Sequence, residues 1–266
     1  MQIHHAQAIS WLTELAGMTP SRTYSLEDIY YAYFLLGKSY ENGFGVRIDP
    51  ANAFKNYAIA AIENPAARLA LGRFFLRGSN SIPKDTETGY MLIYSAYLKD
   101  PSILSDIQQT IVTSDHISGL ENFMKKQAEL GDSDAYYFLC SNMLDGTIFA
   151  YQKNLGMQYL QKALDMKNPY AFFRMAESYE QGLFGESIDT EQALSLYEQA
   201  AGYPQTREKA ARRLADFYQQ ERDYEKAFDY YVMIEDYASA KELLPFFSDS
   251  ESMGERDLFI RVKDFQ

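Results

Sequence analysis

Residues 32–61 read AYFLLGKSYENGFGVRIDPANAFKNYAIAA, and residues 171–201 read AFFRMAESYEQGLFGESIDTEQALSLYEQAA. Both stretches have the same order of residue types. A small residue is followed by Leu or Met, by a second small residue, by Tyr and by Gly; then come Asp, Ala, an aromatic residue and Ala-Ala. A weaker copy, AYYFLCSNMLDGTIFAYQKNLGMQYLQKAL, lies between them at residues 135–164. Self-similarity of this kind predicts a repeat architecture, in which each unit packs on its neighbours.

One position, near the start of the second half of each unit, sets the period. It is occupied by Ala8, Ala53, Gly89, Leu120, Gly156, Ala193 and Ala227, at spacings of 31 to 45 residues. Leu120 is the least typical member, and the unit around it, residues 102–131, is the weakest copy. The marks predict about six repeats after an N-terminal half-repeat.

Helix start and stop signals recur in the same register, and they define each repeat as a pair of helices. Asn or Asp followed by Pro is typical of a helix start, because the first side chain accepts a backbone N–H and Pro loses no hydrogen bond at the first helical position. Glycine is typical of a helix end, where the backbone turns left-handed. The first helices are predicted to start after Asn64, Asp100 and Asn168 and to stop at Gly43, Gly78, Gly146 and Gly182, and the second helices to start after Asp49, Asp85, Asp189 and Asp223.

Small residues also recur in the middle of the predicted helices, where two helices of a hairpin would touch. They include Gly37, Gly72, Cys140, Ala176 and Ala215. The pattern predicts an all-α fold, an α-solenoid of αα-hairpins, as one repeat domain over residues 1–266. We expect an N-terminal helix and insertion at 1–29, hairpins at 30–235 and a capping segment at 236–266.

The composition restricts the partners and the chemistry. The chain has 25 Lys and Arg against 37 Asp and Glu, a net charge of −12, which disfavours nucleic acid and anionic lipid and favours a basic partner. Cys140 is the only cysteine, so no internal disulfide can form. There is no apolar stretch of the roughly 18 residues that a membrane span needs, and no signal peptide pattern. We expect a cytoplasmic protein, unless an export signal has been removed.

Catalytic and cofactor signatures are absent from the sequence. No phosphate-binding loop and no GxSxG nucleophile motif occur. The adjacent His4 and His5 cannot share one helical face, and no cysteine lies near them, so no metal site is predicted. We expect no cofactor and no enzymatic activity.

The repeat resembles the Sel1-like repeat, a longer-looped relative of the tetratricopeptide repeat, over roughly residues 8–234. The resemblance implies a right-handed superhelix whose concave groove is formed by the first helices, and a function as a scaffold or adaptor for other proteins. A narrower version is an immunity or antitoxin protein that inhibits a basic toxin. The alternative is a small-molecule hydrolase, as implied by some Sel1-like proteins.

In such hairpins the first helix presents four fixed positions to the groove, counted from its small residue. We expect a protein or peptide to bind in the groove at Tyr31, Phe34, Lys38, Leu69, Arg73, Tyr137, Tyr170, Phe173, Glu177, Glu180 and Arg212. The other interpretation of the aromatic members is that they pack into the superhelix as core. The positive charges near the N-terminal end and the carboxylates further on would orient a ligand.

Overall fold

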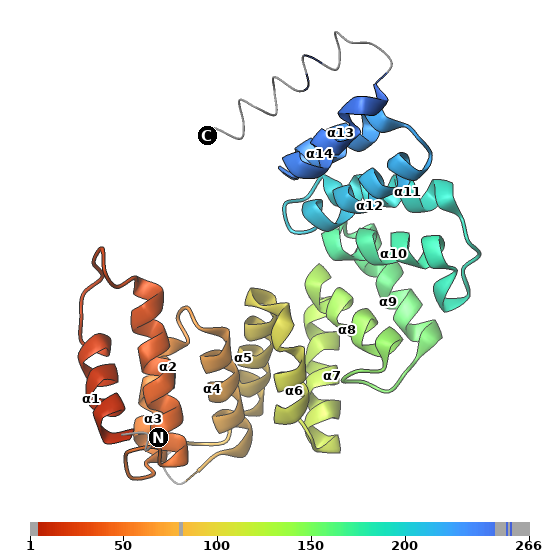
Figure 1. The fold of residues 1–266 in the computed structure, drawn as a ribbon. Coiled ribbons are helices and arrows are strands. Elements are labelled where there is room, and N and C mark those ends of the chain that lie inside the picture. Colours follow the sequence, from red (N-terminus) through yellow and green to blue (C-terminus); the bar gives the residue numbers. More distant parts are fainter. Residues whose placement is uncertain (1–4, 80–81, 248–253, 255, 257–266) are drawn as a thin grey trace. The chain divides into compact units, whose positions relative to one another are not determined.

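A computed structural model describes residues 5–79, 82–247, 254 and 256. Fourteen α-helices, and no strand, occur in these residues (Figure 1). The chain divides into two compact units, one of residues 1–127 and 147–149 and one of residues 128–146 and 150–266. The prediction of an all-α solenoid is confirmed, since both units are built from αα-hairpins in chain order. One domain and one superhelix over the whole chain stay predictions.

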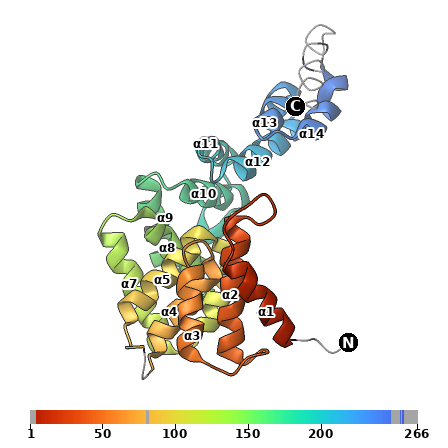
Figure 2. The ribbon, with the colours of Figure 1, turned by 90° about the vertical axis from the view of Figure 1, so that its left-hand side faces the viewer.

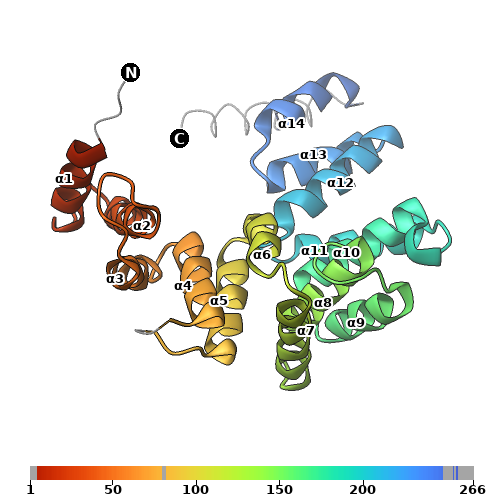
Figure 3. The same cartoon turned by 90° about the horizontal axis from the view of Figure 1, so that it is seen from below.

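Unit 1 begins with α1 (His5–Ala16), which packs on α2 (Leu26–Asn42) as the half-repeat. The next two hairpins are α2 with α3 (Pro50–Ala60), and α4 (Pro65–Arg77) with α5 (Thr86–Lys99). The views of Figures 1 and 2 agree that α2, α3 and α4 lie side by side, and Figure 3 shows α1 to α6 following one another in chain order. The 3-10 turn Pro101–Ile103, α6 (Leu104–Thr110) and most of α7 (Ser114–Glu129) complete the unit.

Unit 2 contains three hairpins. They are α8 (Ser133–Asp145) with α9 (Lys153–Asp165), α10 (Pro169–Gln181) with α11 (Thr190–Ala201), and α12 (Arg207–Gln220) with α13 (Tyr224–Met233). A short 3-10 turn, Leu183–Gly185, follows α10. The helix α14 (Tyr237–Leu243) and the turn Leu244–Phe246 pack on α13, where Ala240, Leu243 and Leu244 close the apolar core of the last hairpin.

The predicted caps are confirmed at the helices that they were assigned to. Asn64, Asn168, Asp49, Asp85, Asp189 and Asp223 each accept a hydrogen bond from a backbone N–H in the first turn of the helix that follows. Gly43, Gly146 and Gly182 end their helices in the left-handed region, which side chains other than glycine rarely adopt. Local sequence therefore fixes where each hairpin begins and turns.

The third hairpin departs from the pattern. Asp100 and Pro101 start only a 3-10 turn, and α6 has seven residues. The position that is small in the other first helices is held here by Gln108, whose side-chain amide donates to the carbonyl of Thr147 at 2.8 Å. The corresponding position of the second helix, α7, is held by the fully buried Leu120. Both positions thus carry large side chains, and α6 and α7 do not pack closely on each other as the paired helices of the regular hairpins do.

Candidate functional site

Four of the residues predicted to bind a partner line one cavity in unit 1. Phe34 and Lys38 come from α2, and Leu69 and Arg73 from α4. The cavity has a volume of about 380 Å³, and α6 contributes Asp106, Gln109 and Thr110 to its wall. This volume lies near the lower end of the range of about 300–1,000 Å³ that is usual for ligand pockets.

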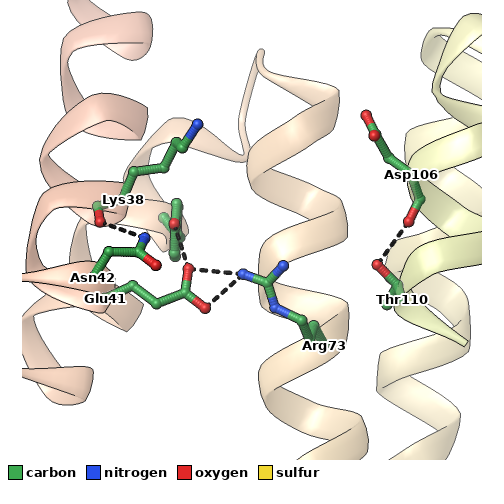
Figure 4. A network of polar contacts seen from close by, with 7 residues as sticks. Lys38, Glu41, Asn42, Arg73, Asp106 and Thr110 are labelled. Carbon is green, nitrogen blue, oxygen red and sulfur yellow. Dashed lines mark hydrogen bonds and ion pairs between the residues drawn. The ribbon is translucent and has the colours of Figure 1, made fainter. Parts of the chain in front are cut away.

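A hydrogen-bond network crosses this cavity between three helices (Figure 4). Glu41 of α2 accepts from the Tyr57 hydroxyl of α3 at 2.7 Å and from Arg73 Nη2 of α4 at 2.6 and 2.7 Å. Burial, followed by the bond to Glu41, raises the pKa of Tyr57 above its usual 10.0. The phenol therefore stays protonated as a donor, and the network holds α2, α3 and α4 in one arrangement.

The charge of the cavity is opposite in sign to that of the chain. Lys38, Arg73 and Arg77 face two carboxylates, Glu41 and Asp106. Arg73 is engaged by Glu41, whereas the Lys38 ammonium lies 5.8 Å from the centre of the Phe34 ring. No carboxylate among the described residues pairs with the exposed Arg77. Two cations thus remain for an acidic group from outside.

The aromatic members are partly surface and partly core. Tyr31 is 52% exposed, and its ring lies 6.0 Å from that of Phe34, which in turn lies 5.9 Å from Tyr57. Leu69 is only 5% exposed. Leu69 is therefore largely buried although it lines the cavity, Phe34 is half-buried, and Tyr31 is open to a partner.

In unit 2 the predicted aromatic residues lie on α8 and α10. The rings of Tyr137 and Tyr170 stack with centroids 5.4 Å apart, and Phe173 meets Tyr197 of α11 edge to face at 5.4 Å. All three of the predicted residues are half-buried. Their rings join neighbouring helices and remain partly exposed.

The predicted carboxylates of unit 2 lie one turn further along α10. Glu180 accepts from the Tyr197 hydroxyl at 2.8 Å and lies 3.7 Å from Arg213 of α12. Glu177 lies 3.6 Å from Nη1 of Arg174, whose other amine pairs with Asp145. Burial raises the pKa of Glu177, although Arg174 and Arg213 oppose the shift.

Arg212 lies apart from these residues. Its guanidinium donates to Asp236 at 2.8 Å, and Asp236 is the N-cap of α14. The structure thus gives Arg212 a local contact in the last hairpin. Its role in partner binding stays a prediction.

Comparison with sequence families matches the Sel1 repeat at residues 31–64, 65–100, 133–168, 169–201 and 208–233. These segments cover more than half of the chain. The protein belongs to the Sel1 repeat family. The unmatched residues between 100 and 133 are those of the irregular third hairpin, so the sequence departure and the structural departure coincide. Sel1 repeats are commonly protein-interaction scaffolds.

Several solved structures are similar to this Sel1 repeat chain. A Sel1 repeat protein of Oxalobacter formigenes is 21% identical, covers 97% of this chain and 95% of its own, and has a TM-score of 0.42. A protective antigen of uropathogenic Escherichia coli is 19% identical with a TM-score of 0.40 over 90% of this chain, which spans 60% of that protein. An immunity protein of Pseudomonas aeruginosa is 19% identical, with a TM-score of 0.37 and coverage of 86% and 81%. No curated protein matches the chain.

The Sel1 register explains which contact residues the sequence prediction left out. Glu41, which binds Arg73, is the fourth groove position of its helix, whereas Tyr57, which donates to Glu41, was left out; they stand four positions after the small residues Gly37 and Ala53 of their helices. Arg213, the partner of Glu180, directly follows the predicted Arg212. The sequence did contain a signal for the contact between Glu41 and Tyr57. In each of the two helices of this repeat, a polar residue stands at the same distance from the small residue.

Two other kinds of site were sought among the described residues. They contain no group of three or more His, Cys, Asp or Glu side chains that could hold a metal ion. None of the helices described is both long and apolar enough to cross a bilayer. Cys140 is buried, and burial raises the pKa of its thiol to about 12, so the thiolate needed for nucleophilic chemistry is disfavoured.

Proposed function

We propose that this Sel1 repeat protein binds a segment of another protein in the cavity of unit 1. The observation that supports it is a cavity of about 380 Å³ in which Phe34 offers an apolar wall and Lys38 and Arg77 offer charge. Interfaces draw most of their energy from a few such anchors, with aromatic and arginine side chains overrepresented among them. The cavity combines these groups on helices rather than on a mobile loop.

The hydrogen-bond network that crosses the cavity favours a binding role because it pre-organises the walls. Glu41 fixes Arg73, and Tyr57 fixes Glu41, before a ligand arrives. A partner then orders few side chains on binding, which lowers the entropic cost of association. The free charges at Lys38 and Arg77 would select the partner, because a like charge placed against them is unfavourable.

The aromatic residues and carboxylates of α8 and α10 form a second surface that we propose for a partner, in unit 2. Its carboxylates Glu177 and Glu180 would favour basic residues, in line with the net charge of the chain. The narrower expectation of an immunity or antitoxin function rests on that acidic charge and stays a prediction, as does the hydrolase alternative.

The test is affinity purification of the tagged protein from its native cells, with bound proteins identified by mass spectrometry. The variant Lys38→Glu/Arg77→Glu reverses the two free charges of the cavity. The control Arg47→Glu/Lys55→Glu makes the same charge change at exposed positions outside it. We expect a captured protein that the control retains and the cavity variant loses. The same proteins at the same yield with both variants would refute the proposal.

A further inference from the structure

A second hollow lies in unit 1, at the N-terminal ends of α2 and α4. It has a volume of about 260 Å³ and is lined by Glu27, Asp28, Tyr30, Tyr31, Glu63, Asn64 and Pro65. Three of these residues are carboxylates and two are tyrosines, and no Lys or Arg lines the hollow. Its chemistry is therefore the reverse of that of the larger cavity.

The carboxylates of the hollow differ in how they are engaged. Asp28 accepts from the backbone N–H and the hydroxyl of Ser25, each at 2.8 Å, in the capping box of α2. Glu63 pairs with Lys99 of α5. Glu27 has no ion-pair partner among the described residues, and it lines the hollow together with Tyr30 and Tyr31. A hollow that contains both a carboxylate and aromatic rings can attract a Lys or Arg side chain through charge and through cation–π contact.

The two hollows share the helices α2 and α4. Along α2, Glu27 and Lys38 are eleven residues apart, which corresponds to roughly 16 Å of helix. Tyr31 and Phe34 lie between them on the same helix, with their rings 6.0 Å apart. A segment lying along α2 would thus meet carboxylates first, then an aromatic surface, then cations.

We infer that the partner segment carries a basic residue for the hollow at Glu27 and an acidic residue for the cavity at Lys38 and Arg77, roughly 16 Å apart. This inference rests on the proposed function and specifies the chemistry of the partner. An extended segment covers that distance with about five residues and a helix with about eleven. The two opposite charges fix the direction in which the segment lies, because the reversed placement puts like charges together.

The probes are fluorescently labelled peptides with blocked termini, built of Ala and Ser around one central Leu. Each carries two charged residues at a separation of three to eleven residues, in the combinations Lys with Glu, Lys with Lys, and Glu with Glu. Fluorescence anisotropy against the full chain gives the dissociation constants. For the spacing that fits, we expect the mixed peptide to bind roughly tenfold more tightly than either like-charged peptide.

Two variants are expected to change, in opposite directions, which of the charged peptides binds most tightly. Lys38→Glu is expected to favour the Lys–Lys peptide, and Glu27→Lys the Glu–Glu peptide, while Lys55→Glu keeps the wild-type order. Equal binding of the mixed and Glu–Glu peptides by the wild type, or an unchanged order in Glu27→Lys, would overturn the inference and leave the proposed function standing.

The purification described above supplies a second measurement, with the Glu27→Lys variant added. Loss of the captured protein in this variant, as in the cavity variant, supports the inference even if none of the short peptides binds. Retention in Glu27→Lys with loss in Lys38→Glu/Arg77→Glu overturns the inference alone. Retention in all variants, with no peptide bound, refutes the proposed function together with it.

Discussion

The hydroxyl of Tyr57 on α3 donates a hydrogen bond to Glu41 on α2 at 2.7 Å, and the two residues hold equivalent positions in the two helices of one hairpin. Each stands four residues after the small residue at which those helices touch. The relationship recurs where the same positions are polar: Tyr197 donates to Glu180 at 2.8 Å, and Tyr231 to Gln219 at 2.9 Å. A tyrosine in the second helix thus predicts an acceptor in the first.

Where these positions are apolar, the two side chains are part of the core of the hairpin. The pairs are then Leu76 with Ile93 and Leu144 with Leu160, all buried. In both hairpins the small residue of the second helix is glycine, and the leucine of the first helix occupies the space of the missing side chain. A Cβ on Gly89 would lie 2.8 Å from Leu76 Cδ2, and one on Gly156 would lie 2.8 Å from Leu144 Cγ. The Leu and Gly positions are therefore coupled by packing.

Removing the Tyr57 hydroxyl tests the polar version of this pairing. Tyr57→Phe keeps the ring and its contacts but leaves Glu41 with Arg73 alone. Because a hydrogen bond to a charged group contributes about 1.5–3 kcal/mol, and Glu41 is partly exposed, we expect unfolding to become easier by about 1–2 kcal/mol. Urea denaturation followed by circular dichroism measures the change.

The matched control is Tyr24→Phe, in the same unit, whose hydroxyl has no hydrogen-bond partner among the described residues. We expect the midpoint of urea denaturation of Tyr24→Phe to equal that of the wild type. Equal losses in Tyr57→Phe and Tyr24→Phe would show that the bond to Glu41 contributes nothing specific.

The apolar version is tested by a double-mutant cycle at Gly156 and Leu144. Gly156→Ala alone should destabilise the protein, because the strain of overpacking, about 1–3 kcal/mol, exceeds the gain in helix propensity, about 1 kcal/mol. Leu144→Ala removes the obstructing side chain, so in that background the second change should be stabilising. The reversal of sign in the free energy of unfolding is the readout. Additive effects of the two substitutions would refute the coupling.

The sequence was sufficient for features that depend on one segment of backbone. The caps Asp49 and Asn64 and the glycine stop Gly43 follow from which side chains accept a nearby N–H and which residue tolerates a left-handed turn. The touching positions follow in the same way, since close helices admit only small residues. These local rules predicted the hairpins and their register.

The partners of surface side chains could not be predicted in this way, because they depend on the neighbouring hairpin. Leu69, one of the predicted binding residues, is largely buried by the packing of α4 and still lines the cavity of unit 1, so its role in binding stays a prediction. Arg212 pairs with Asp236 in a helix beyond the last recognised repeat, and its neighbour Arg213 pairs with Glu180 instead. The irregular third hairpin had a signal in Gln108, a large residue at a small position, whose consequence only the folded chain shows.

Glu177 gives a pH-dependent prediction. Because burial raises its pKa above the usual 4.5, the folded protein keeps this proton to higher pH than the unfolded chain does. The cost of carrying the charge is absent below about pH 4.5 and is fully present above the folded pKa. Glu177→Gln should therefore become more stable relative to the wild type as the pH rises through this range. Urea midpoints at several pH values measure the difference, and a difference that shrinks with rising pH would contradict it.

Substitutions at Arg212 and Asp236 distinguish whether Arg212 stabilises the last hairpin or contributes to partner binding. Asp236 accepts from the backbone N–H of Ser239 at 3.1 Å and so caps α14, whereas Arg212 contributes only an exposed ion pair. We expect Asp236→Ala to cost about 0.5–2 kcal/mol and Arg212→Ala about 0.2–1 kcal/mol. Hydrogen exchange of the amides of residues 237–243 should accelerate strongly in Asp236→Ala and weakly in Arg212→Ala.

If Arg212→Ala instead abolishes capture of a partner while exchange in α14 stays at the wild-type rate, Arg212 acts in binding as the sequence predicted. Capture that is unchanged in Arg212→Ala assigns the residue to the last hairpin alone.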